Sequence, residues 1–173
     1  MSDQWPTVPD GELERGGWRL ADRTRERLFE LPRVTVDGHT RLYEEPSVGE
    51  QFGIDEPLCF FFATRLAFQP ELPGGASRLV EPMIRTRARS QFLGDLRERG
   101  FLDLQYRTDD DFRTADGHAG QLTTVRGRCR VDATGWLAVW QNETFFVAGG
   151  GYPNIDTERN YREELLNLLR NVR

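Results

Sequence analysis

Apolar and polar positions alternate along several segments of this chain, and that alternation predicts β-strands. The strongest segment is residues 58–68, where phenylalanine and other apolar side chains fall on both sides. Apolar residues on both sides indicate a strand that is covered on both faces. Residues 101–107 and 119–131 alternate more strictly, which predicts strands with one buried face.

Turn residues are expected to join the strands into hairpins. Asp37-Gly38 lies between two runs of β-branched and aromatic residues, and this dipeptide favours the two-residue turn of a hairpin. A second hairpin is predicted from residues 136–141 and 144–148. The glycine-rich residues 149–154 predict a turn that leads out of the sheet.

Two segments repeat their apolar residues at helical spacing. Residues 79–99 predict the first helix, and Gly100 suits the position just after its end. Residues 157–172 predict the second helix, with Asp156 or Thr157 as its N-cap. The pattern of strands followed by helices indicates an α+β protein with a central antiparallel β-sheet of about six to seven strands between helices.

The N-terminal residues suggest a different organisation. Residues 1–20 are rich in proline, glycine and polar residues, which predicts an irregular N-terminal arm with Trp5 and Trp18 as anchors. Residues 21–173 are expected to form a single α+β domain. Within it, residues 24–31 fit either a short helix or the start of a strand.

The order of elements from about residue 34 onward resembles the PsbP-like fold. That fold is shared by the PsbP subunit of photosystem II and the Ran-binding Mog family of nuclear import factors. The local likeness is closest where residues 135–140 precede residues 144–149 and Tyr152-Pro153 leads into the last helix. The resemblance implies an α/β/α sandwich with a binding or assembly role, and it carries over no functional residue and no partner.

Composition narrows the chemistry, because all 23 basic residues are arginines and there is no lysine. Schiff-base catalysis, a lysine general base and a P-loop are therefore excluded. The 28 acidic residues give a net charge of −5, which argues against nucleic acid as a partner. Acidity combined with arginine-only basicity resembles the proteins of salt-adapted microbes, so a halophilic archaeal source is expected.

No segment predicts a membrane span, a secretory signal or a lipid anchor, so a cytoplasmic location is expected. The two cysteines, Cys59 and Cys129, lie in strand-like segments outside any CxxC pair. They are expected to be buried free thiols.

Arginines and tryptophans are the main candidates for a binding site. Arg126, Arg128 and Arg130 alternate, so they share one strand face and could bind an anion or an acidic partner. Trp136 and Trp140 also share a face and could line a groove. One further candidate for an anion contact is the arginine that follows Gly74-Gly75 near the start of the first helix, Arg78.

Two Asp-Gly-His segments are the candidates for a metal site. Asp37 and His39 belong to the first, and Asp116 and His118 belong to the second. If the two turns met in space, their imidazoles and carboxylates could form a mixed nitrogen and oxygen site. The alternative is that each segment is an ordinary turn, because Asp-Gly is common turn chemistry.

No catalytic constellation emerges from the sequence, and no cofactor is predicted. The leading hypothesis is a non-catalytic module that binds a protein partner or assembles with a second copy of itself. The first alternative is a binder or enzyme for a small anionic ligand that uses the arginine-rich strand face. The second alternative is the His/Asp metal-binding protein.

Overall fold

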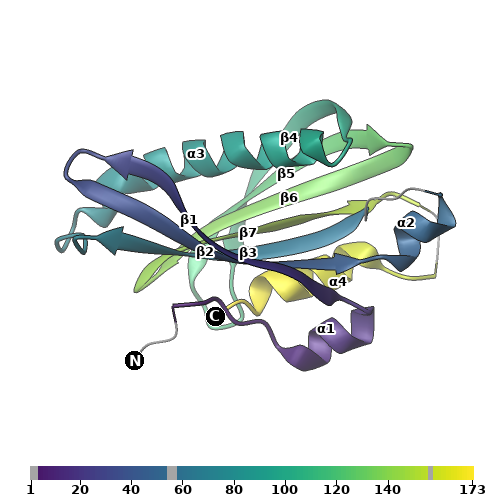
Figure 1. Cartoon of the computed structure of the whole chain (residues 1–173), viewed down its shortest axis with the longest axis horizontal. Helices are drawn as coiled ribbons and strands as arrows, with labels where there is room; N and C mark the ends of the chain where they lie inside the picture. The colour runs from purple at the N-terminus through teal and green to yellow at the C-terminus, as the bar shows by residue number, and fades with distance from the viewer. Residues whose placement is uncertain (1–3, 54–57, 156–157) are drawn as a thin grey trace.

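The computed structural model describes residues 4–53, 58–155 and 158–173. Within these residues, seven antiparallel strands form one sheet in the order β1-β2-β3-β7-β6-β5-β4 (Figure 1). The strands are β1 (Arg19–Leu31), β2 (Val34–Glu45), β3 (Cys59–Gln69), β4 (Leu102–Arg113), β5 (Ala119–Cys129), β6 (Val131–Asn142) and β7 (Thr144–Pro153).

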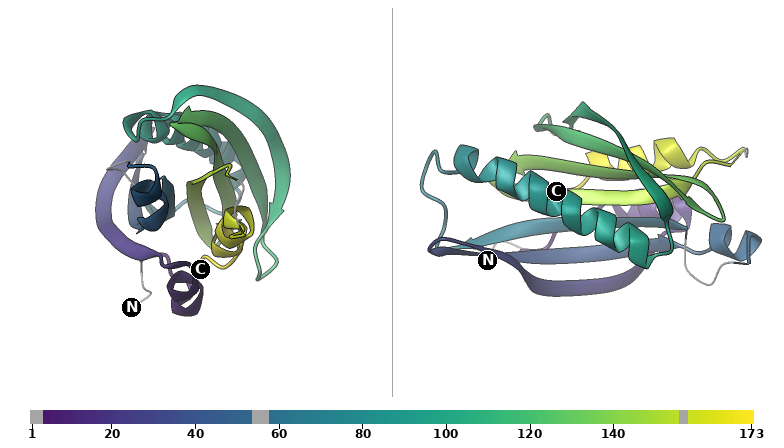
Figure 2. Two further views of the ribbon diagram at one scale, coloured as in Figure 1. Left: turned by 90° about the vertical axis from the view of Figure 1, so that its right-hand side faces the viewer. Right: turned by 90° about the horizontal axis from the view of Figure 1, so that it is seen from above.

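Four helices accompany the sheet in the described residues, so the α+β class predicted from the sequence is confirmed. They are α1 (Asp10–Gly16), α2 (Ser47–Gln51), α3 (Ser77–Glu98) and α4 (Tyr161–Arg170). The helix α3 lies on one face of the curved sheet, and α4 and α1 lie on the other (Figures 1 and 2). Among the described residues, no helix is both long and apolar enough to cross a membrane.

Glycines in the central strands allow the two long helices to approach the sheet. A Cβ at Gly135 in β6 would lie 3.1 Å from Leu96 and 3.2 Å from Phe92, which are both on α3. On the opposite face, a Cβ at Gly150 in β7 would lie 2.9 Å from Leu165 on α4. The core therefore has two layers, one on each face of β3, β7 and β6.

The burial of β3 agrees with its apolar pattern. Phe60 faces the α3 layer and is 1% exposed, while Phe61 faces the α4 layer and is fully buried. Cys59 and Cys129 are both buried, as the sequence predicted, and they form no disulfide among the described residues. Burial raises the pKa of the Cys59 thiol, with a further contribution from Glu45. This thiol is therefore a packing residue at neutral pH.

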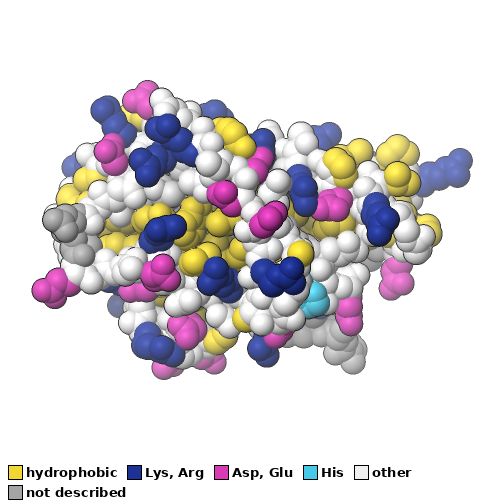
Figure 3. Space-filling view, turned by 180° about the vertical axis from the view of Figure 1, so that it is seen from behind, with side chains coloured by type: hydrophobic (Ala, Val, Ile, Leu, Met, Phe, Trp, Pro, Cys, Tyr) yellow, Lys and Arg dark blue, Asp and Glu magenta, His cyan; other side chains and the backbone are white. Residues whose placement is uncertain are grey.

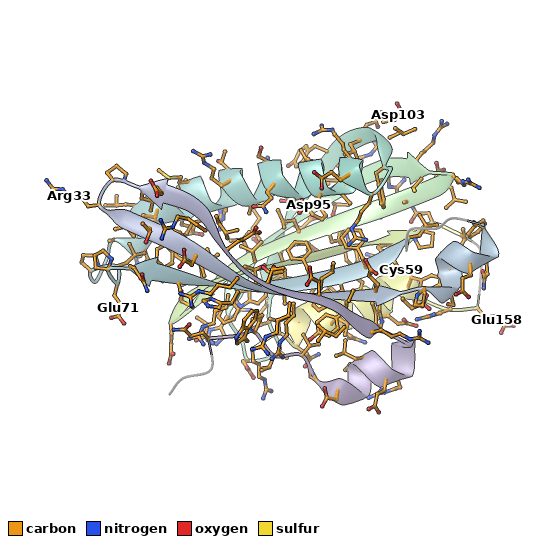
Figure 4. The ribbon with its side chains drawn as sticks, viewed as in Figure 1. Arg33, Cys59, Glu71, Asp95, Asp103 and Glu158 are labelled. Atoms are coloured by element: carbon orange, nitrogen blue, oxygen red, sulfur yellow. The ribbon has the colours of Figure 1, made fainter. Side chains whose placement is uncertain are left out.

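The first hairpin differs from its prediction. Asp37 and Gly38 lie in the middle of β2, and the turn between β1 and β2 is at Pro32-Arg33. Arg33 takes the positive φ that the turn requires and lies at the hairpin tip (Figure 4). The prediction of a turn at Asp37-Gly38 was wrong because β2 is paired on both sides, and this pairing outweighs the turn preference of one dipeptide.

Several other boundaries also differ. The N-terminal arm expected at residues 1–20 contains α1 and the start of β1, and residues 24–31 are strand. The turn expected at residues 149–154 is wrong because β7 continues to Pro153. The proposed caps Asp156 and Thr157 lie outside the described residues. In the structure, α4 begins at Tyr161, and the side chain of Asn160 accepts a hydrogen bond from the Glu163 amide.

Candidate functional site

A groove of about 810 Å³ lies between α3 and the strands β1, β2 and β3, and we call it the α3 groove. It exists because α3 rests on β6 at Gly135 and does not pack closely on β1 and β2. The size of this groove is within the range of small-molecule sites. Nine apolar side chains line it from β1, β2, β3, α3 and β7: Leu28, Leu42, Phe60, Phe62, Leu66, Ile84, Ala88, Phe92 and Val147.

A row of threonines crosses the floor of the α3 groove. Thr24, Thr40 and Thr64 are cross-strand neighbours on β1, β2 and β3. The hydroxyls of Thr40 and Thr64 are 2.7 Å apart and form a hydrogen bond. Each hydroxyl can both donate and accept, so this row can serve polar atoms of a ligand above an otherwise apolar floor.

Carboxylates outnumber guanidinium groups around the α3 groove by five to two. The acidic residues come from both sides, since β1 and β2 supply three and α3 supplies two: Asp22, Glu26, Glu44, Asp95 and Glu98. The two cations are Arg87 and Arg99. The groove therefore has a negative potential, which its low-dielectric walls concentrate.

Arg99 is already engaged by the protein. Both of its terminal nitrogens donate to Glu44 at 3.3 Å, and its guanidinium lies 4.0 Å from the centre of the Phe60 ring. This contact neutralises Glu44. The remaining acidic lining residues therefore carry the excess negative charge.

Asp95 is the carboxylate best placed to act on a ligand. It is half-buried on the side of α3 that faces the sheet (Figure 4). Its side chain has no hydrogen bond or ion pair with any residue that the structure describes. Burial raises the pKa of Asp95, and the neighbouring charge of Glu98 adds to that effect. A positive group in the groove would stabilise the ionised carboxylate and so offset the effects of burial and of Glu98.

Two of the sequence-predicted residues meet at a second hollow, of about 740 Å³, between β5, β6 and the start of α4. Figure 3 shows a hollow with hydrophobic side chains on its floor on the back of the molecule. Arg126 and Trp136 both line the second hollow, but Trp136 is only 5% exposed. Tyr152 packs edge-on against its ring at 5.4 Å, and Arg162 lies 5.9 Å from the ring centre. Little of the indole is left for a ligand.

Trp140 shares a sheet face with Trp136, as predicted, but does not reach the hollow. Its ring stacks on Phe146 at 5.5 Å and packs against Phe112 at 5.6 Å, and it is 3% exposed. The two tryptophans therefore do not form the wall of a groove. Trp140 is a core residue.

The three alternating arginines do not act as one set. Arg126 and Arg128 lie on the same face of β5, whereas Arg130 is in the turn to β6 with a positive φ. Arg128 is 3.9 Å from Asp103, and Arg130 donates to the Phe52 carbonyl at 3.3 Å. The turn removes Arg130 from the face that strand alternation predicted for it.

Arg78 lies in the first turn of α3, in a shallow region with Glu81 and Arg85. It is exposed, and it lines neither the α3 groove nor the hollow beside β5. The structure thus separates Arg78 from the other predicted anion contacts.

The two Asp-Gly-His segments also lie apart. His39 is in β2 and His118 just precedes β5, and four strand spacings separate these strands, about 19 Å along the sheet. Asp37 pairs with Arg25 at 3.7 Å, and Asp116 pairs with Arg173 at 3.2 Å. Among the described residues, no group of three or more His, Cys, Asp or Glu side chains is arranged to hold a metal.

A larger group of arginines, which was not predicted from the sequence, lies on the face of β1, β2 and β3 opposite the α3 groove. We call this group the arginine face: Arg23, Arg25, Arg27, Arg41 and Arg65. The signal is present in β1, where Asp22-Arg23-Thr24-Arg25-Glu26-Arg27 places arginine at every second position. One side of this strand is basic, and the other presents carboxylates and threonine to the groove.

Comparison with known protein families gives a match over residues 5–173 to a domain of unknown function, DUF6517. The chain belongs to the DUF6517 family. No curated protein sequence is significantly similar to it. The DUF6517 match runs from the N-terminal arm to the end of the chain, so it includes both the α3 groove and the arginine face.

Proposed function

We propose that this protein is a ligand-binding domain and that the α3 groove holds a small amphipathic cation. The observation that carries the proposal is the combination of an apolar floor with carboxylates that the protein itself leaves unpaired. An apolar body would cover the partly exposed Phe62 and Leu42, and a protonated amine would lie beside Asp95. The threonine row would accept or donate further hydrogen bonds.

The charge of the ligand follows from electrostatics. An anion would have to lie among five carboxylates, and a neutral ligand would leave Asp95 half-buried without a counter-charge. A cation removes both costs. An ion pair in a partly dry groove is also stronger than the same pair at a fully exposed surface.

The wider expectations from the sequence remain proposals. A likeness to the PsbP-like sandwich is supported by an antiparallel sheet with helices on its two faces. A cytoplasmic location and a halophilic source are supported by composition alone. A protein partner or a second copy of the chain is the other occupant to consider for the groove.

Calorimetry with chain-length-matched ligands below their micelle concentrations tests the groove. Decylamine, decanoate and decanol share an apolar body and differ in charge. We expect decylamine to bind about tenfold or more tightly than decanoate, with decanol between them. Putrescine, which has charge and little apolar surface, should bind weakly.

Two tryptophan substitutions show where the ligand binds. Ala88 lines the groove from α3, so Ala88→Trp should fill it and abolish decylamine binding. Leu79 is on the same helix, is 82% exposed and lies outside the groove, so Leu79→Trp is the matched control. Equal binding of decylamine and decanoate, or binding that survives Ala88→Trp, would contradict the proposed function.

A further inference from the structure

The arginine face contains like-charged cross-strand neighbours. Arg23 on β1 lies directly opposite Arg41 on β2. In the next row, His39 lies between Arg25 and Arg65. Like charges opposite one another destabilise a sheet, so this arrangement works against folding. Side chains that oppose local stability in this way are expected at functional sites.

The protein compensates this positive charge only in part. Asp37 lies 3.7 Å from Arg25 and 3.5 Å from Arg27, and Arg27 is also 3.4 Å from Glu30. These contacts are at one end of the arginine face. At the other end, Arg23 and Arg41 form no ion pair among the described residues. The charge left unpaired is therefore concentrated around the Arg23–Arg41 pair.

Buried polar atoms without partners lie within this pair and in the row beside it. His39 is 2% exposed, and its Nδ1 has no hydrogen-bond partner in the described part of the chain. The Nε of Arg41 is buried and without a hydrogen-bond partner in the same residues. Burial, followed by the charge of Arg25, lowers the pKa of His39 and favours the neutral imidazole. Unsatisfied buried polar atoms suggest a missing partner.

The N-terminal arm supplies a rigid wall for this site. The Trp5 ring packs edge-on against His39 at 5.1 Å between ring centres. The Arg23 guanidinium lies 3.9 Å from the centre of the Trp5 ring. Backbone hydrogen bonds between Thr7 and Arg173 fix the arm to the C-terminus. Figure 4 shows nitrogen-tipped side chains gathered beneath β1 and β2. Arg23 is thereby held in place before any ligand arrives.

We propose that the arginine face binds a small ligand that carries two or more linked phosphoryl groups. Guanidinium groups match phosphate oxygens in bidentate geometry. Arginines two residues apart on a strand are about 7 Å apart, and those on neighbouring strands about 5 Å apart, so a chain of phosphoryl groups can contact several of them. This site is on the opposite sheet face from the α3 groove, and each can fail without the other.

Calorimetry with inorganic tripolyphosphate at low ionic strength tests this site. We expect binding that weakens as salt rises, and a loss of about tenfold or more in Arg23→Gln/Arg41→Gln. The matched control is Arg97→Gln/Arg107→Gln, which removes the same charge at exposed positions outside both sites and should change affinity less than about threefold. The single Arg23→Gln change affects an exposed side chain and should also weaken binding.

Other ligands separate the possible sources of the anion. Monophosphate and citrate should bind more weakly than tripolyphosphate if linked phosphoryl groups are recognised. Comparing ATP with tripolyphosphate shows whether a nucleoside adds affinity. The proposal is overturned if tripolyphosphate does not bind, if only Arg126→Gln/Arg128→Gln weakens binding, or if a 20-nucleotide single-stranded DNA binds far more tightly than any small phosphate.

Discussion

Arg23 and Arg41 lie directly opposite each other on β1 and β2, with no carboxylate between them among the described residues. Their neighbours Asp22 and Leu42 are also paired across the same two strands, but face the α3 groove. One two-stranded ribbon therefore has an acidic side with an apolar floor and a basic side. Strand alternation alone produces both surfaces.

Replacing Arg41 with leucine should stabilise the protein. Arg41→Leu removes one member of a like-charged pair and a buried Nε without a hydrogen-bond partner, so we expect a gain of about 0.2–1 kcal/mol in the free energy of unfolding. Urea unfolding measures it, with Arg97→Leu as the exposed control. A loss of stability would mean that Arg41 contributes packing that outweighs its charge.

The carboxyl group of Asp95 should make stability fall as pH rises. Because burial raises its pKa in the folded protein, the folded state keeps the proton at a pH where the unfolded chain has lost it. The stability of the folded state relative to the unfolded chain is therefore highest below the pKa that Asp95 has in the unfolded chain. It falls as the pH rises through the pKa that Asp95 has in the folded protein. We expect Asp95→Asn to be more stable than the parent at pH 7 and equal to it near pH 3.

Urea unfolding at both pH values checks this expectation. Asp132→Asn, which changes an exposed carboxylate on β6, should alter stability by less than about 0.5 kcal/mol at either pH. If Asp95→Asn is less stable than the parent at pH 7, the carboxylate of Asp95 makes an interaction that its geometry does not reveal.

Adding one methyl group at Gly150 should disrupt the packing of α4. A Cβ there would overlap the Phe60 carbonyl oxygen and lie 2.9 Å from Leu165, and the backbone of β3 cannot move aside within a paired sheet. We expect Gly150→Ala to cost about 2–3 kcal/mol. Gly94→Ala is the control, because a Cβ at that position of α3 meets no atom within 4 Å and alanine favours a helix by about 1 kcal/mol. Equal melting temperatures for the two variants would contradict this prediction.

The central strands and the long helices were predictable because local pattern and tertiary environment agree there. Residues 58–68 are apolar on both sides, and β3 is buried on both faces. The helical repeat at residues 79–99 corresponds to α3, and the turn around Glu143 joins β6 to β7. In each case one short-range signal is sufficient.

The glycine segments were not predictable in the same way. From the sequence, Gly38 and Gly150 predict turns. In the structure each lies within a strand, and a neighbouring side chain occupies the space that a Cβ would need. Leu28 occupies that space at Gly38, and Leu165 does so at Gly150. Such contacts depend on how strands pair and where a helix packs, so no local pattern of residues reveals them.

The candidate sites were predictable only in chemical type. Arginine alternation correctly places Arg126 and Arg128 on one face of β5, but it is wrong for Arg130, which lies in the turn. The same alternation on β1 gives the continuous arginine face. The α3 groove requires Asp95 and Glu26 to face each other from a helix and an edge strand. That convergence depends on how far α3 lies from the sheet, which the sequence does not specify.

Arg159 connects three elements that are distant in sequence, and removing it should loosen the α1 side of the fold. It makes two hydrogen bonds of 2.8 Å to Glu164 on α4, lies 3.4 Å from Glu45 at the end of β2, and donates to the Gly16 carbonyl at the end of α1. Glu45 is only 3% exposed, so the loss of its counter-charge would leave a buried carboxylate.

We therefore expect Arg159→Met to lower the free energy of unfolding by about 2–3 kcal/mol, less than for a fully buried pair because Arg159 keeps some contact with water. Arg15→Met is the control, since Arg15 is exposed and pairs with Glu12 on its own helix, and it should change stability by less than about 0.5 kcal/mol. Hydrogen exchange should show faster opening of α1 and of the start of α4 in Arg159→Met, while β3 and β6 keep their protection. Uniform loss of protection across the sheet would instead mean that Arg159 supports the whole fold, and unchanged protection of α1 would mean that Trp18 and Leu13 hold the helix without it.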